Sequence, residues 1–404
     1  MSLSTTNYQL QTFPKTMLVD MNSFFASVEQ QANPFFRGKP LGVCASLHET
    51  SCLIAASKEA KKLGIKTGTL IYQAKKIYPG IILVESEPEK YRRVNHELIR
   101  ILSDYSPNIE VYSIDEAFVD LRDMPSNPLK IGAEIKRRIK EEVGEFLTCS
   151  VGIGPNKFIA KLAADLKKPD GLSVIWRDQL HAVYETKSLK DLWGVSYGWI
   201  RRLEKLGITK PKQLLTYPVQ NLISIFGKPG FYLWQRVNGL EEDEIRNNSD
   251  PPKSFGHSWV LNFRTTSKDK LKPVILRLAE KAAVRMRKEN FHAYGMYLNI
   301  TLVDRHIYGR SKKLTHPINT GLQLYQESVS LWKDWKFKTE VLHIAVGFSH
   351  LKLESSQMVL FGKNNFSLIP ALDKINEKYG DFTIRSGLLT LTSDYAPDAI
   401  AFGK

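Results

Sequence analysis

The sequence predicts a multidomain protein of the α+β class. At roughly 100–200 residues per domain, its 404 residues suggest about two to four domains. Strand-like runs alternate with segments of helical periodicity up to about residue 175, and two adjacent strand-like runs carry acidic residues where they meet. The chain then becomes helical near Trp193 and strongly basic after the polar stretch 246–253.

The elements of the first part follow from periodicity and from glycine and proline punctuation. Helices are predicted at 22–31, 58–63, 88–105, 129–143 and 156–166. Strands are predicted at 16–19, 81–84, 108–112, 117–121, 148–153 and 172–175.

The second part begins with a glycine-punctuated hairpin over 192–208, which leads into an amphipathic helix and further helical segments through Gly239. The polar, proline-containing stretch 246–253 is typical of an interdomain linker. Beyond it, helices are predicted over 271–289 and up to Trp332. Strands are predicted at 257–263, 297–303, 311–315 and 340–348.

Composition narrows the class of protein. With 43% hydrophobic and 25% charged residues, the chain is an ordinary globular protein rather than a disordered or collagen-like one. No apolar run approaches the roughly 18–20 residues of a membrane span, and the polar opening lacks the layout of a signal peptide. We therefore expect a cytoplasmic protein that does not bind membranes. Its cysteines, Cys44, Cys52 and Cys149, form no CxxC pair, and we expect all of them to be reduced and buried.

The net charge of +15 favours a polyanionic partner, most often nucleic acid, although a merely basic surface is an alternative. Residues 253–352 hold 18 Lys and Arg against 7 Asp and Glu, so this quarter of the chain carries most of the excess. That concentration favours a dedicated binding module, with solvated helix faces as the alternative. The candidate phosphate contacts are Arg285, Arg287, Arg305, Arg310, Lys312 and Lys313.

The acidic residues Asp20, Asp115 and Glu116 lie at predicted strand ends. Carboxylates that converge in this way can bind Mg²⁺, which prefers oxygen ligands. Neighbouring residues on a strand point to opposite faces, so Asp115 and Glu116 can serve one site only if the backbone bends there, as a hairpin turn would allow. Two such ions would suit an in-line phosphoryl displacement. The alternative is that these acids cap helices or pair with surface lysines, and spacing alone does not exclude it.

Several motifs in order resemble the Y-family translesion DNA polymerases of the bacterial polymerase IV and V type. They are VDMNSFFASVE at 19–29, YSIDEAF at 112–118, VGIG at 151–154 and AKLAAD at 160–165. The resemblance runs from about residue 16 to the end of the chain. It implies a right-hand polymerase with a ferredoxin-like βαββαβ palm, small fingers, a helix-hairpin-helix thumb and an α+β little finger.

By this resemblance, Asp20, Asp115 and Glu116 would be the catalytic side-chain ligands of two Mg²⁺ ions, and Met21 would contribute its backbone carbonyl. Phe25 matches the aromatic steric gate, which occupies the space that a ribose 2′-hydroxyl would need. A plain core aromatic is the alternative for Phe25. The amides around Ser23 and Phe24 open a helix and would suit a triphosphate.

Three lysines match positions that contact the incoming nucleotide. Lys168 matches the family's triphosphate lysine, with a solvated cation as the alternative. Lys58 and Lys61 stand where many relatives have Tyr and Arg. Because lysine is a point charge without arginine's bidentate fork, charge complementarity is kept while the detailed phosphate geometry is not.

The resemblance also implies contacts to DNA and to a sliding clamp. Gly194, Ser196 and Gly198 lie in a stretch similar to the thumb hairpin, which offers backbone amides to phosphates; an ordinary helix connection is the alternative. The pentapeptide Gln357, Met358, Val359, Leu360 and Phe361 resembles the peptide with which bacterial polymerases bind the clamp. An accessory subunit of the SOS response is a further expected partner.

The domain ranges implied are 14–23 with 88–175 for the palm, 24–87 for the fingers, 176–246 for the thumb, 247–253 for the linker, 254–352 for the little finger and 353–404 for the tail. The expected activity is low-fidelity, template-directed translesion synthesis, by nucleotidyl transfer from a dNTP to a primer 3′-hydroxyl with release of pyrophosphate. One rival is a catalytically silent, clamp-tethered DNA-binding scaffold. Another is a different two-metal enzyme on a similar palm, such as a nucleotide cyclase or a nuclease.

Overall fold

The computed structural model describes residues 14–122, 124, 127–241, 244–247, 251–353 and 368–391. The chain divides into two compact units, the first ending at residue 249 and the second beginning at residue 250. This division falls inside the stretch predicted as a linker. Within the described residues, no helix has both the length and the apolar character that crossing a membrane requires.

A five-stranded sheet in the order β5-β6-β1-β7-β8 forms the centre of the first unit. The middle strand, β1 (Thr16–Met21), is antiparallel to β6 (Glu116–Asp120) and β7 (Cys149–Gly154). The edges are β5 (Ile109–Val111) and β8 (Leu172–Val174). Every residue of β1 is buried, because helices cover both faces of the sheet.

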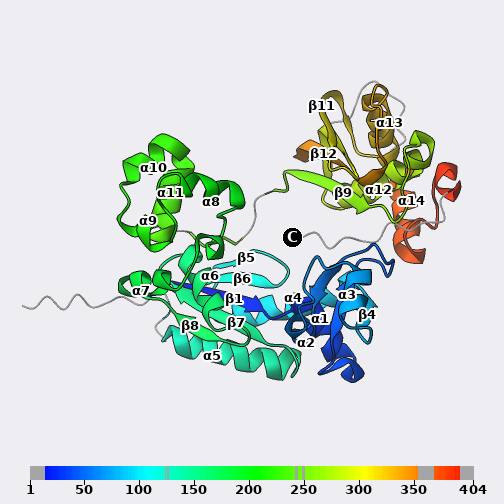
Figure 1. Ribbon diagram of the computed structural model, residues 1–404. Helices are drawn as coiled ribbons and strands as arrows, with labels where there is room; N and C mark the ends of the chain where they lie inside the picture. The colour runs from blue at the N-terminus through cyan, green and yellow to red at the C-terminus, as the bar shows by residue number, and fades with distance from the viewer. Residues whose placement is uncertain are drawn as a thin grey trace, which may run out of the picture. The chain divides into compact units, whose positions relative to one another are not determined.

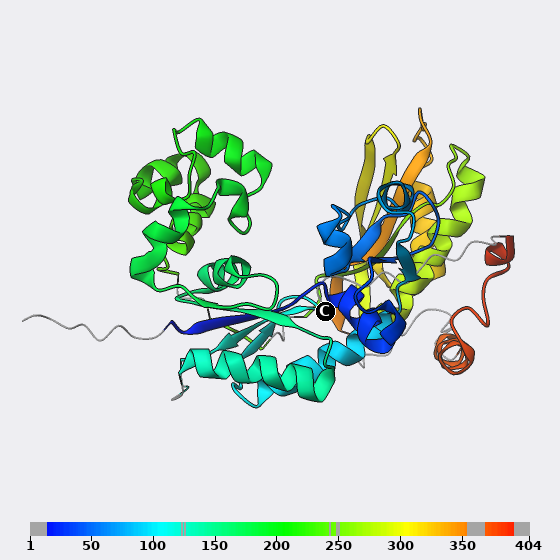
Figure 2. The same ribbon diagram turned by 60° about the horizontal axis from the view of Figure 1, so that its bottom comes forward.

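Helices α4 (Pro88–Ser103) and α5 (Pro128–Arg138) share one core with the sheet face that carries Met17 and Val151, and α6 (Lys157–Leu166) covers the opposite face (Figures 1 and 2). A π-helical turn at Ile139–Val143 continues α5, in agreement with the single helix predicted at 129–143. On the α6 side, a Cβ atom at Gly152 would come within 2.1 Å of the Ala160 carbonyl oxygen. Only glycine therefore permits this close approach of helix and strand.

A smaller sheet in the order β3-β2-β4 belongs to the same unit. Its strands are β2 (Leu41–Cys44), β3 (Leu53–Ala56) and β4 (Ile82–Glu85), and its helices are α1 (Phe24–Ala32), α2 (Lys58–Lys62) and α3 (Ile71–Ile77). The prediction found α1, α2 and β4 and missed β2, β3 and α3. Helix α1 contacts this sheet and also α4, so it joins the two layers of the unit.

The prediction that all cysteines are buried is wrong for Cys52. Cys44 and Cys149 are buried as expected, but Cys52 is exposed, and all of these thiols are free. Cys52 lies just before β3 and forms only an isolated bridge to Leu70, so it remains at the border of the small sheet.

A helical region completes the first unit, as predicted. Its helices are α7 (Leu180–Glu185), α8 (Tyr197–Glu204), α9 (Lys212–Thr216), α10 (Val219–Phe226) and α11 (Lys228–Val237). Their apolar side chains share a core with Phe158 and Leu162 of α6. Farther along, Ile245 is buried against Leu18 and Phe118 of the central sheet.

The second unit is a four-stranded antiparallel sheet in the order β11-β10-β12-β9, with helices on one face. Its elements are β9 (Ser254–Val260), α12 (Lys268–Lys288), β10 (Phe291–Leu302), β11 (Ile307–Ile318), α13 (Gly321–Leu331), β12 (Val341–Leu353) and α14 (Leu368–Tyr379). Strand β10 begins six residues before the predicted strand. Helix α14 was not predicted.

The other sheet face of the second unit carries no helix from the described residues. Tyr297 and Asn299 of β10 alternate with the buried Leu298 and Ile300 and therefore point to this face. Their register partners include Gly347 and Gly309, and the Tyr297 hydroxyl lies over Gly256 and Gly347. Because glycines lie beside Tyr297 and Asn299, this helix-free face is comparatively flat there.

Candidate active site

Strand register brings the acidic residues together at one end of the central sheet. Asp20 near the end of β1 pairs directly with Glu116, the first residue of β6. Asp115 lies in the turn before β6, and its carbonyl oxygen accepts a hydrogen bond from the Met21 amide at 2.9 Å. The backbone therefore bends directly before Glu116, as is needed for the neighbouring Asp115 and Glu116 to serve one site.

Side chains around the turn fix the position of Asp115. The Ser113 hydroxyl donates to Asp115 Oδ1 at 2.6 Å, and the Asn95 amide donates to the Ile114 carbonyl at 2.9 Å. These contacts hold the turn from the strand side and from α4. The carboxylate consequently has a defined direction toward the end of β1.

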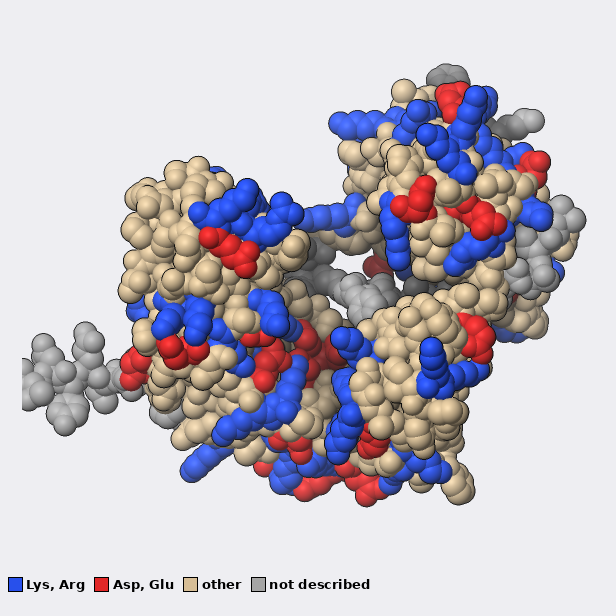
Figure 3. Space-filling view, viewed as in Figure 1, with Lys and Arg blue, Asp and Glu red and all other residues tan. Residues whose placement is uncertain are grey.

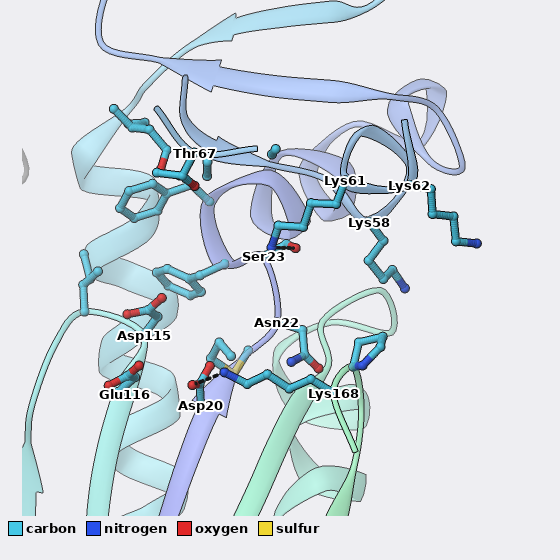
Figure 4. Close-up of a pocket in the computed structure, with 18 residues that line it drawn as sticks. Asp20, Asn22, Ser23, Lys58, Lys61, Lys62, Thr67, Asp115, Glu116 and Lys168 are labelled. Atoms are coloured by element: carbon cyan, nitrogen blue, oxygen red, sulfur yellow. Dashed lines mark hydrogen bonds and ion pairs between the residues drawn. The ribbon is translucent and has the colours of Figure 1, made fainter. Parts of the chain in front are cut away.

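The acids open into a cavity of about 600 Å³ that collects the residues of several motifs (Figure 4). All ten residues predicted as metal or nucleotide contacts line it: Asp20, Met21, Ser23, Phe24, Phe25, Lys58, Lys61, Asp115, Glu116 and Lys168. They come from β1, from α1 with its N-cap, from α2, from β6 with the turn before it, and from the loop after α6. The structure thus places the whole predicted set in one site.

Lysine side chains neutralise two of the carboxylates. Lys168 Nζ lies 2.6 Å from Asp20 Oδ2, and Lys161 Nζ on α6 lies 2.6 Å from both oxygens of Glu116. Within the described ranges, no three His, Cys, Asp or Glu side chains already stand close enough together to hold a metal ion. A cation that binds these carboxylates would therefore compete with the two ammonium groups.

Burial disfavours the charged forms of these acids. It raises the pKa of Asp20 to about 6, although the Lys168 ammonium opposes this change. Burial also raises the pKa of Asp115, and the neighbouring Asp20 carboxylate adds to the effect. The site therefore concentrates negative charge that needs cations, which is the electrostatic condition for binding a divalent metal.

The side of the cavity formed by α2 is basic. Lys61 Nζ on α2 donates to Ser23 Oγ at 2.8 Å, at the start of α1, and burial together with Lys168 lowers the pKa of Lys61 (Figure 4). Ser23 has a left-handed backbone with φ of 50°, so the chain turns sharply between β1 and α1. An ammonium group and the first amides of a nine-residue helix thus face one space.

Lys58 and Lys61 differ in their contacts. The Lys58 ammonium lies 5.4 Å from the centre of the Phe146 ring, and the Arg37 guanidinium lies 5.5 Å from it. Phe146 follows the π-helical turn, so this contact joins the small sheet's helix to the central layer. Both lysines line the cavity, but the Lys58 ammonium packs against the Phe146 ring, whereas the Lys61 ammonium donates a hydrogen bond to Ser23.

A buried amide fixes the loop that carries Lys168. Asn22 Oδ1 accepts from the Asp170 amide at 2.7 Å, and Asn22 Nδ2 donates to Ser150 Oγ at 2.9 Å. Lys136 Nζ donates to Asp170 Oδ1 at 2.7 Å on the other side of the loop. Sequence reasoning assigned no role to Asn22 or Lys161, although both lie inside the recognised motifs. Their contacts to residues distant in sequence could not be inferred from spacing.

The predicted thumb contacts lie outside this cavity. Gly194 has φ of 78° and precedes α8, whose N-cap is Ser196 and whose second residue is Gly198. Tyr197 at the start of α8 is exposed. A turn with a left-handed glycine therefore precedes α8, and both the helix-hairpin-helix and its role as a phosphate contact stay predictions.

The predicted DNA contacts of the second unit divide into two groups. Arg285, Arg287, Arg310 and Lys312 contact protein groups, namely the Gly256 carbonyl, Asp373, the Leu331 carbonyl and Glu327. The exposed side chains of Arg305 and Lys313 make no hydrogen bond or ion pair to other described residues. In the view of Figure 3, Lys and Arg predominate over Asp and Glu on this unit. The clamp-like peptide 357–361 lies outside the described residues.

Comparison with known proteins now decides the family. The model of the impB/mucB/samB family matches residues 19–165, and the model of that family's C-terminal domain matches residues 252–360. Together they cover more than half of the chain. The chain belongs to this family.

Curated relatives agree with this assignment. The chain is 33% identical to DNA polymerase IV of Moorella thermoacetica over 91% of its own length and 94% of the relative's. It is 29% identical to DNA polymerase IV 1 of Bacillus subtilis over 96% and 95% of the two chains. The protein is therefore a DNA-directed DNA polymerase of the Y family.

A solved structure confirms the fold of this polymerase. The Y-family DNA polymerase chimera Dbh-Dpo4(243-245)-Dbh has a TM-score of 0.74 and 28% identity to it, and the match covers 84% of this chain and 99% of that one. The predicted mixed α+β class is confirmed. The division into palm, fingers, thumb and little finger stays a prediction.

Proposed function

We propose that this polymerase performs translesion synthesis: opposite damaged template bases, the primer 3′-hydroxyl attacks the α-phosphate of a dNTP, the nucleoside monophosphate joins the primer and pyrophosphate leaves. The observation that carries the proposal is the cavity in which Asp20, Asp115 and Glu116 face the lysines of α2 and of the loop after α6. Such a site offers oxygen ligands for cations on one side and positive charge for a triphosphate on the other. Catalysis would then depend mainly on positioning and electrostatics.

Two Mg²⁺ ions fit the donor set. The carboxylates of Asp20, Asp115 and Glu116 and the carbonyl of Met21 are hard oxygen donors, and they lie at the ends of adjacent strands. When bound, the ions would activate the primer hydroxyl and stabilise negative charge on the reacting phosphate. The chain itself holds Asp115 through Ser113 and supplies the lysines that balance the acids.

The incoming nucleotide would lie with its phosphates toward Lys61, Lys168 and the amides of Ser23, Phe24 and Phe25. Lys58 would add charge from the same helix as Lys61, after leaving the Phe146 ring. The Phe25 side chain lines the cavity and is 4% exposed, so it could fill the space beside the sugar. Phe25 would thus select deoxyribonucleotides.

DNA would bind through the hairpin at Gly194, Ser196 and Gly198 and through the second unit. The exposed Arg305 and Lys313 support phosphate contact best, because the other predicted cations already have protein partners. One structural relative, at a TM-score of 0.57, is titled an insertion ternary complex of Dbh DNA polymerase. We infer that this chain likewise binds primer–template and dNTP together.

The remaining elements of the proposal concern partners and subdomains. Residues 357–361 would bind a sliding clamp, and an accessory subunit of the SOS response could modulate the activity. The central sheet would be the palm, the small sheet the fingers, the helical region the thumb, and the second unit's sheet the little finger. A small-fingered site of this kind suits low-fidelity synthesis.

Primer extension by the full chain tests the proposal. With Mg²⁺ and dNTPs, we expect wild-type protein to extend primers on undamaged and abasic templates, and Asp115→Ala to lose extension by roughly 10²–10³-fold or more. Asp115→Ala should still bind primer–template. Absence of wild-type extension with clamp present would contradict the proposal and favour the scaffold. Shortened DNA or a cyclic nucleotide as product would instead favour the other two-metal enzymes.

A further inference from the structure

Phe25 is supported from behind by a second aromatic ring. The ring of Tyr91, on α4, stacks on that of Phe25 with 4.4 Å between centroids and 25° between planes. Tyr91 is fully buried and does not line the cavity, whereas Phe25 does. Tyr91 therefore occupies the side of the Phe25 ring that faces away from the substrate space.

A buried carboxylate fixes the Tyr91 ring in turn. The Tyr91 hydroxyl donates to Glu29 Oε1 at 2.7 Å, and Lys90 Nζ donates to Glu29 Oε2 at 2.9 Å. Phe25 and Glu29 are four residues apart on α1 and share one helix face. Tyr91 thus contacts both residues at once, with its ring on Phe25 and its hydroxyl on Glu29.

The charge state of this cluster keeps the contact in place. Burial, followed by the Glu29 carboxylate, raises the pKa of Tyr91, so its hydroxyl remains a donor at neutral pH. The Glu29 side chain is only 4% exposed, yet it lies outside the cavity. A buried carboxylate is costly unless it is paired, and this one is paired with both the Tyr91 hydroxyl and the Lys90 ammonium.

We propose that Tyr91 and Glu29 are positioning residues for sugar selection, holding the Phe25 ring where it excludes a ribose 2′-hydroxyl. This inference rests on the proposed function, since it requires Phe25 to be the steric gate. A gate acts by occupying space, so its selectivity depends on how far the ring can retreat from the sugar. The stacked Tyr91 ring prevents the Phe25 ring from moving into the core, and the hydrogen bond to Glu29 holds the Tyr91 ring in place.

The test is the ratio of kcat/KM for a dNTP to kcat/KM for the matching rNTP, measured by primer extension. Because a stacked aromatic pair shifts an equilibrium between ring positions by roughly two- to tenfold, we expect Tyr91→Leu to lower this ratio by about tenfold. Tyr91→Phe keeps the ring and loses the hydroxyl, so its ratio should fall by about two- to threefold. Glu29→Gln keeps an acceptor for the Tyr91 hydroxyl, so its ratio should fall no further than the ratio of Tyr91→Phe.

Gln30 provides a matched control on the same helix. It is buried beside Glu29 and donates to the Phe36 carbonyl at 3.2 Å, and its side chain makes no hydrogen bond to Phe25 or Tyr91. Gln30→Ala should therefore lower stability without changing the ratio. A ratio that falls equally in Gln30→Ala would mean that general loosening of α1 is responsible, and would overturn the inference.

Phe25→Ala separates this inference from the proposed function. If wild type extends primers and Phe25→Ala admits ribonucleotides, the gate exists; unchanged ratios in Tyr91→Leu, Tyr91→Phe and Glu29→Gln would then overturn only the positioning role. If wild type fails to extend primers, the proposed function fails and the inference fails with it. If extension is normal and Phe25→Ala leaves the ratio unchanged, Phe25 is not the gate and the inference is wrong.

Discussion

The two units use charged side chains in opposite ways. In the first unit, three acids from two segments meet at one cavity, and lysines from α6 and the following loop contact two of them at 2.6 Å. In the second unit, the basic residues are spread along α12 and β11, and several contact carbonyls or carboxylates of their own unit. The first unit concentrates its charged side chains at one cavity, whereas the second unit distributes its cations over many separate contacts.

This difference predicts different responses to mutation. In the proposed mechanism Asp20, Asp115 and Glu116 bind metal ions, so removal of one of these charges should abolish primer extension. Removal of one charge from the second unit should weaken DNA binding by a small and additive amount. The predictions below test that contrast.

The largest expected effect concerns Glu116. Replacement by Gln removes the negative charge while preserving shape, so extension should fall by roughly 10²–10³-fold or more, with primer–template binding retained. The matched control is Asp120→Asn, at the other end of the same strand, where the carboxylate pairs with Arg122 outside the cavity. Primer extension and a DNA-binding assay distinguish them. Equal losses in both variants would mean that the strand, rather than the cavity charge, is responsible.

The next effect separates the two lysines of α2. Lys61→Ala should raise KM for dNTP by roughly 10–100-fold, because in the proposed function Lys61 makes a charge-assisted hydrogen bond to phosphate. Lys58→Ala should have a smaller effect, since Lys58 must first leave the Phe146 ring. Lys66→Ala, exposed and outside the cavity, is the control. Steady-state kinetics give the comparison, and a larger effect for Lys58 than for Lys61 would contradict it.

A smaller effect is expected in the second unit. Lys313→Ala should reduce DNA affinity modestly and lower the slope of log K against log salt by about 0.9, the value for one lost phosphate contact on duplex DNA. Arg305→Ala should behave similarly. Lys312→Ala should change the slope less, because Lys312 pairs with Glu327 at 2.7 Å. Titrations of labelled duplex at several salt concentrations measure these slopes, and equal slopes for Lys312 and Lys313 would remove the distinction between paired and free cations.

The same contrast explains what the sequence could predict. Asp20, Asp115 and Glu116 could be expected near one another from the sequence, because they lie inside short motifs at predicted strand ends; their role as metal ligands was implied by the family resemblance and stays a prediction. The contacts of Asn22, Lys161 and Tyr91 were missed, because each joins segments more than 40 residues apart.

In the second unit, composition indicated a basic module but could not show which cations are free. Arg310 and Arg305 look alike in sequence, yet only β-sheet register and helix packing turn Arg310 toward the Leu331 carbonyl. The missed strands β2 and β3 contain Gly42 and two alanines, which are residue types of low strand propensity.

The smallest effect concerns Arg287, which was predicted as a DNA contact. Its guanidinium makes two hydrogen bonds to Asp373 of α14, at 2.8 and 2.7 Å, and its side chain is 14% exposed. A double-mutant cycle with Arg287→Ala and Asp373→Ala should give a coupling energy of about 1 kcal/mol in urea unfolding, since the pair is bidentate and partly buried. The more exposed pair Lys288–Glu377 should couple more weakly. DNA affinity should fall less in Arg287→Ala than in Lys313→Ala. The reverse order would mean that Arg287 exchanges Asp373 for phosphate, and that ion pairs within the second unit do not withhold its cations from DNA.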